Sequence, residues 1–113
     1  MSSHDLTNGG LPPLDPDEEL AVEAAARDAR LLVTNKRLLV AADRGVTLNV
    51  PIEGLRRIQL DLERERPATL VVVPEMRHDE PQVLSLEPEQ YDAAARLLVA
   101  IGRRFAEIDR QGA

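Results

Sequence analysis

Apolar and polar residues alternate along much of this chain, and the period of the alternation changes near its C-terminal end. Residues 46–50 and 58–62 carry apolar side chains at every second position, which is typical of β-strands with one buried face. Residues 68–73 form a continuous apolar run rich in β-branched side chains, which predicts the most buried strand. A short run at residues 82–86 predicts the last strand.

Residues 31–42, LLVTNKRLLVAA, consist of two apolar runs on either side of Asn35 and Lys36. This arrangement predicts a tight β-hairpin, because asparagine tolerates the left-handed backbone that two-residue turns require. Residues 20–27 are ambiguous. Their alanines, with Asp15 as a cap and Pro16 at a first helical position, favour a helix, whereas pairing with the hairpin favours a strand.

After Pro88 the apolar residues recur at spacings of three and four, which predicts one amphipathic helix that ends near Arg110. Leu98 lies in the middle of the expected apolar stripe. Gly102 also falls in the stripe, where glycine costs about 1 kcal/mol relative to alanine. We expect a close approach of the helix to the sheet to compensate for that cost. The expected stripe comprises Tyr91, Ala94, Ala95, Leu98, Ile101, Gly102, Phe105 and Ile108.

Two segments in this order resemble a known family. Residues 31–40, LLVTNKRLLV, look like the L-x-x-T-N-[KR]-R-L hairpin of bacterial PH-like and GRAM-type domains. Residues 50–58, VPIEGLRRI, look like the I-P-x-x-x-I-x-x-[VI] turn and strand that follow it. The resemblance covers about residues 17–108.

The resemblance implies the pleckstrin-homology superfold, which is mainly β with one C-terminal α-helix. We therefore expect a β-barrel of seven antiparallel strands in two near-orthogonal sheets, capped by the long amphipathic helix. A count of seven requires residues 20–27 to be the first strand. We expect the domain to span residues 17–110, preceded by a disordered tail at residues 1–16, which is polar and rich in Gly and Pro.

Net charge, cysteine content and the length of the apolar runs exclude several classes of function. The formal net charge of -6 disfavours non-specific binding to nucleic acid or to an anionic membrane, so we expect no nucleic-acid partner. The absence of cysteine excludes disulfides and thiolate chemistry. The first residues lack the apolar core of a secretory signal, and no apolar run approaches the length of a membrane span. These features predict a soluble, cytoplasmic protein, and the excess of arginine over lysine suggests a GC-rich bacterial genome.

Five basic residues are candidates for contacts with a ligand or partner: Arg30, Lys36, Arg37, Arg56 and Arg57. Arg30 and Arg37 flank the same hairpin and are expected to lie close together. Lipid-binding members of the superfold use a longer loop between the first two strands. Here that link is only about residues 27–30 and includes an acid.

Two further clusters contain side chains of the types that bind metals. His78, Asp79 and Glu80 lie in one loop, but the only other histidine is His4, so a solvated loop is expected. The acids at positions 15, 17, 18 and 19 lack the spacing of a calcium loop, and capping or solubility explains them. We therefore expect no metal and no cofactor.

We predict no enzymatic activity and no small-molecule substrate, because the sequence has no G-x-S-x-G turn and no phosphate-binding glycine loop. The predicted role is a non-catalytic module that binds a protein or associates with itself through edge strands. One alternative is a peripheral membrane module that recognises anionic lipid headgroups. Another is a ligand carrier or small enzyme subunit that uses the barrel interior, although a core of Leu and Val leaves little room there.

Overall fold

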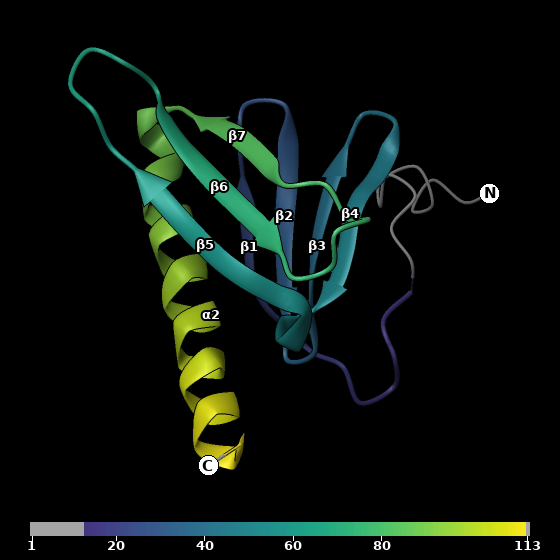
Figure 1. The fold of residues 1–113 in the computed structure, drawn as a ribbon. Helices are drawn as coiled ribbons and strands as arrows, with labels where there is room; N and C mark the ends of the chain where they lie inside the picture. Colours follow the sequence, from purple (N-terminus) through teal and green to yellow (C-terminus); the bar gives the residue numbers. More distant parts are fainter. Residues whose placement is uncertain (1–12, 113) are drawn as a thin grey trace.

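The computed structural model describes residues 13–112, which form seven β-strands, two short 3-10 helices and one long α-helix (Figure 1). The strands are β1 (Leu20–Ala25), β2 (Ala29–Thr34), β3 (Arg37–Ala42), β4 (Gly45–Pro51), β5 (Leu55–Asp61), β6 (Ala68–Pro74) and β7 (Gln82–Leu86). The helices are η1 (Ile52–Gly54), η2 (Pro88–Gln90) and α2 (Tyr91–Gly112). The ambiguous segment at residues 20–27 is therefore a strand in its first part.

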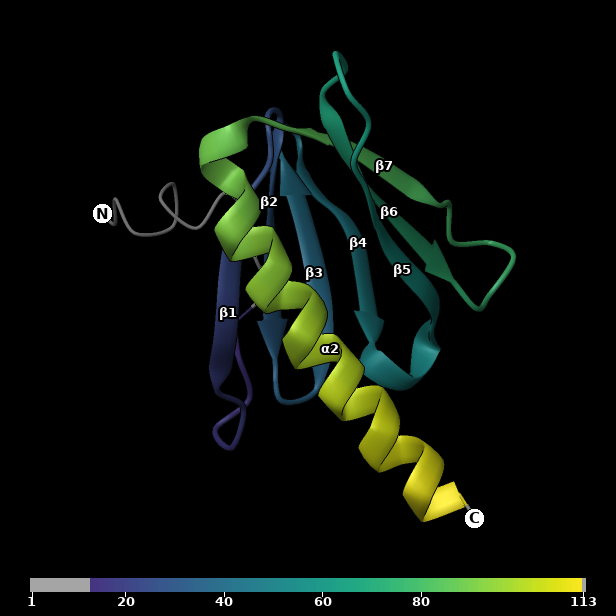
Figure 2. The same cartoon turned by 90° about the vertical axis from the view of Figure 1, so that its left-hand side faces the viewer.

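The strands pair antiparallel in two sheets, with the orders β1-β2-β3-β4 and β5-β6-β7. The two sheets face each other, and α2 runs along their open side, where it packs against β1, β5 and η1 (Figure 2). The mainly β fold with a single C-terminal helix is confirmed.

The expectation of a closed barrel is wrong. Strands β4 and β5 belong to different sheets, because η1 redirects the chain between them. Between the β1–β2 turn and β7, the described residues share a single backbone hydrogen bond, from Arg27 N–H to the Ser85 carbonyl at 2.8 Å. The structure is therefore two separate sheets with a helix at their open side.

The core is aliphatic, as the scarcity of aromatic residues predicts. Strand β6 alternates strictly: its inward side chains are buried and its outward side chains are partly exposed. Both sheets and α2 contribute to one cluster. Its largest fully buried members are Leu31, Leu38, Val40, Ile52, Leu70, Val72, Leu86, Leu97 and Ile101.

The buried face of α2 differs from the expected stripe. Leu97 is fully buried between Ala94 and Ile101, whereas Leu98 is only partly buried. Gly102 is exposed, and a Cβ added there would meet no atom within 4 Å. The expected close approach at Gly102 is therefore wrong. Two adjacent leucines allow two apolar stripes on this helix, and the stripe through Leu97 packs into the core that both sheets share.

Candidate interaction surfaces

Glu18 is a carboxylate that is buried just before β1. Its side chain is 0% exposed. Arg37 donates to it from Nε to Oε2 at 2.8 Å and from Nη2 to Oε1 at 3.1 Å. The Thr34 hydroxyl donates to Oε2 at 2.6 Å, and the Asp15 N–H donates to Oε1 at 3.0 Å. The hydrogen bonds from Arg37 lower the pKa of Glu18 to about 2, although burial acts in the opposite direction.

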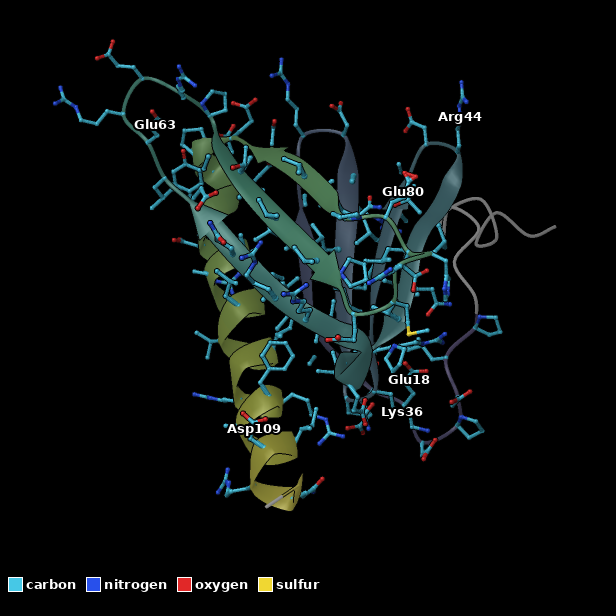
Figure 3. The ribbon with its side chains drawn as sticks, in the orientation of Figure 1. Glu18, Lys36, Arg44, Glu63, Glu80 and Asp109 are labelled. Atoms are coloured by element: carbon cyan, nitrogen blue, oxygen red, sulfur yellow. The ribbon has the colours of Figure 1, made fainter. Side chains whose placement is uncertain are left out.

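Lys36, next to Arg37 in the turn, is also held by acids. Its Nζ lies 2.7 Å from Asp17 Oδ1 and 3.4 Å from Asp15 Oδ2. The hydrogen bond to Asp17 raises the pKa of Lys36 and lowers the pKa of Asp17. Asn35, which precedes Lys36 in the turn, accepts the Glu19 N–H through Oδ1 at 2.8 Å. We call residues 15–19 together with residues 34–37 the hairpin clasp. Figure 3 shows Glu18 and Lys36 at the same end of the molecule.

The hairpin clasp gives the acidic cluster a role that capping and solubility do not cover. The cluster neutralises the cations of the β2–β3 turn and fixes the entry of the chain into β1. Arg37 Nη2 also donates to the Pro13 carbonyl at 3.1 Å, so the contacts of the domain begin before residue 17. Of the tail predicted at residues 1–16, residues 1–12 lie outside the described part. The sequence signal for the hairpin clasp was the opposite charge of two segments, D-P-D-E-E at residues 15–19 and T-N-K-R at residues 34–37.

The structure does not bring the five basic candidates together. Arg30 is paired with Ala41 in the β2–β3 register, whereas Arg37 is paired with Pro51 in the β3–β4 register at the other end of β3. The expected proximity of Arg30 and Arg37 is therefore wrong. Arg30 instead forms an ion pair with Glu23 across β1 and β2, with Nη1 3.2 Å from Oε2.

Arg56 and Arg57 lie on β5, where the register with β6 shifts between Leu55 and Arg57. Both side chains are exposed, and neither forms an ion pair within residues 13–112. Such irregularities re-aim side chains at a strand edge. Of the five basic candidates, these two arginines are therefore the ones that remain accessible to a ligand, because no acid among the described residues pairs with them.

The loop between β6 and β7 carries the other predicted cluster. His78 Nε2 lies 3.9 Å from Asp79 Oδ2, and both residues border a shallow hollow with Glu80 and Thr47. In the described part of the chain, no three His, Asp or Glu side chains are placed so that together they could hold a metal ion. His4 lies outside the described residues.

A second hollow lies between β1, which is an edge strand, and α2. Its floor is formed by small and branched apolar side chains, and its charged lining residues are Arg96 and Arg103. Val99, in the middle, is 52% exposed. We call this hollow the β1–α2 groove. Its apolar lining residues are Ala21, Val22, Ala95, Val99 and Ala100.

No family model matches this sequence, and no curated protein matches it. Two solved structures do. A pleckstrin homology domain from Shewanella amazonensis SB2B is 21% identical, with a TM-score of 0.63 over 90% of this chain and 93% of its own. A DUF1696 family protein with a pleckstrin-homology domain from Shewanella loihica PV-4 is 19% identical, with a TM-score of 0.57 over 93% of this chain and 87% of its own.

The fold of this chain is thus pleckstrin-homology-like, as the hairpin and turn motifs suggested, and its structural neighbours are bacterial. The comparisons do not confirm the GRAM-type resemblance. Among residues 13–112, no helix has the length and apolar character to cross a membrane.

Proposed function

We propose that this domain is a non-catalytic interaction module that binds a protein partner or associates with itself. The observation that carries the proposal is that acidic side chains of the same chain already pair with three of the five basic candidates. Arg30, Lys36 and Arg37, which headgroup recognition would require to be free, each form an ion pair with an acid of the same chain. A phosphate ligand would have to displace the buried Glu18 carboxylate from Arg37, whereas the exposed pairs of Arg30 and Lys36 hold their cations more weakly.

The apolar surface supports the same proposal. Val99, which lines the β1–α2 groove, is 52% exposed. An exposed apolar side chain in a groove beside an edge strand is typical of surfaces that contact proteins. A net charge of -6 opposes adsorption to anionic lipid, so a specific protein contact is the favoured use of such a surface.

A second candidate, binding to anionic lipid headgroups, is supported by Arg56 and Arg57. Both are exposed on β5, and no described acid pairs with them. Two adjacent cations contribute about 1 kcal/mol each near an anionic surface. The sum is weak against the repulsion of the remaining acidic surface.

Sedimentation with vesicles separates the two candidates. The whole chain is mixed with vesicles that contain phosphatidylglycerol or phosphoinositide at about 150 mM salt, where the Debye length is about 8 Å. We expect no saturable binding. Variants Arg37→Glu and Arg56→Glu/Arg57→Glu serve as controls. Binding by the wild type that either variant loses would overturn the protein-interaction proposal.

Protein binding is tested directly with the same chain. We expect sedimentation velocity to show mass-action self-association, or an immobilised wild-type chain to retain a protein that a Val99→Glu bait does not retain. If the chain stays monomeric and both baits retain the same proteins, the proposal is wrong. Circular dichroism of each variant verifies that it is folded.

A further inference from the structure

The charged side chains that line the β1–α2 groove are both cationic, whereas the adjoining hollow that shares Arg103 is also lined by Glu107. The two cationic side chains, Arg96 and Arg103, lie seven residues apart on α2, which corresponds to about 10.5 Å along the helix axis. Neither forms an ion pair within the described residues. The groove between η1 and α2, in contrast, is lined by Glu53 and Asp109 as well as Arg56. The β1–α2 groove is therefore complementary to an apolar side chain flanked by carboxylates.

The chain itself presents such a group. Leu62 follows β5 and is 65% exposed, and its neighbours in sequence are Asp61 and Glu63. The β5–β6 loop extends beyond the sheets (Figure 1), and Glu63 lies on this projecting loop (Figure 3). Asp61 accepts a hydrogen bond from Gln59 Nε2 at 2.6 Å, which leaves its other oxygen available.

The loop also contains two arginines, Arg64 and Arg66. Arg66 Nε lies 3.9 Å from Glu63 Oε2, and both side chains are about two-thirds or more exposed. An exposed pair at this distance contributes little, so Glu63 can exchange Arg66 for another cation at small cost.

We propose that the β5–β6 loop of one copy docks into the β1–α2 groove of a second copy. Leu62 lies on the floor beside Val99, and Asp61 and Glu63 face Arg96 and Arg103. In an extended segment Asp61 and Glu63 are about 6.6 Å apart on the face opposite Leu62, so the long side chains of Arg96 and Arg103 reach them from the rim of the groove. This inference rests on the proposed function and names the partner surface.

The two surfaces are different patches, so the contact is heterologous rather than two-fold symmetric. Each copy has a net charge of -6, and the copies repel each other on average. Association therefore depends on this one contact between opposite charges. It should weaken as salt is raised.

Charge reversal tests the proposal. Variants Arg103→Glu and Glu63→Arg are each studied alone and as an equimolar mixture by sedimentation velocity. In each single variant the contact places like charges together, so we expect the dissociation constant to rise by about tenfold or more. In the mixture, both contacts between unlike variants pair opposite charges, and association should return. Control variants Arg110→Glu and Glu75→Arg, at exposed positions outside both surfaces, should associate like the wild type.

Three results would overturn the inference: a wild type that is monomeric at about 1 mM, self-association that both single variants retain, or a mixture that stays dissociated. Failure of the inference is distinct from failure of the proposed function. A monomeric chain that retains another protein through Val99 leaves the function standing, whereas vesicle binding removes both. Thermal unfolding of each variant verifies that it is folded.

Discussion

Glu18 and Arg37 form a bidentate ion pair in which the carboxylate is buried and the guanidinium is largely buried. The side chains are 0% and 19% exposed, and the shorter of the two contacts is 2.8 Å. The pair joins the segment before β1 to the first residue of β3. A fork of two parallel hydrogen bonds fixes both the distance and the orientation of the joined segments.

Replacement of Glu18 by glutamine should lower the free energy of unfolding by about 2–4 kcal/mol, because Arg37 then loses its charged partner in a buried position. Urea denaturation measures the change. The matched variant Asp17→Asn removes an acid that is 75% exposed in the same hairpin clasp. It should cost less than about 1 kcal/mol. Equal costs for the two variants would show that burial of Glu18 contributes nothing.

Stability should depend on pH in a window set by Glu18. Its pKa is lowered from 4.5 to about 2 in the folded chain. The folded state therefore gains stability from this group above about pH 4.5, and it loses that gain as the pH falls toward 2. At about 1.4 kcal/mol per pKa unit, the loss is on the order of 3 kcal/mol. Urea unfolding across this range should give a steeper slope for the wild type than for Glu18→Gln, and parallel curves would contradict the assignment.

The buried face of α2 predicts that Leu97 contributes more to the free energy of unfolding than the exposed side chains of the helix do. Leu97→Ala should lower the free energy of unfolding by about 2–5 kcal/mol, because Leu97 is fully buried and its removal leaves a cavity. Val99→Ala, two residues away on the exposed face, should cost less than about 1 kcal/mol. Chemical denaturation of both variants tests the orientation of the helix. A larger cost at Val99 would mean that the helix is rotated.

Two glycines should respond with opposite signs to the same substitution. Gly102→Ala should stabilise the chain by about 0.5–1 kcal/mol, because Gly102 is inside a helix and an added Cβ meets open space. Gly45→Ala should destabilise it by more than about 1 kcal/mol, because Gly45 has a φ of +114° after the Asp43–Arg44 turn. Melting temperatures of the pair provide the measurement. A loss of stability at Gly102 would restore the close approach that the sequence suggested.

The sequence predicted the parts of the fold that local patterning encodes. Alternation marked β4 and β5, and the turn at Asn35 and Lys36 marked the β2–β3 hairpin. Residues 20–25 became a strand only through pairing with β2, which local propensity does not report. The rotation of α2 likewise depends on packing against the core of both sheets, and the apolar spacing alone allowed Leu97 or Leu98 to face inward.

Less of the candidate surfaces was predictable. The five basic residues were selected by charge alone, and their ion pairs with acids distant in sequence emerge only from the register of the strands. Arg37, for example, meets Glu18 because β1 enters beside the β2–β3 turn. The β1–α2 groove joins residues near both ends of the described chain, and no local motif marks it.

The packing of α2 against β1 has a consequence for the order of folding. The two elements are separated in sequence by all six remaining strands, so α2 is synthesised after every strand. Until α2 is available, β1 has no helix to cover it. Contacts of such long sequence separation slow folding, and partly assembled sheets with open edges are prone to aggregate. Truncation within α2 should therefore reduce soluble yield more sharply than loss of a similar length elsewhere on the surface.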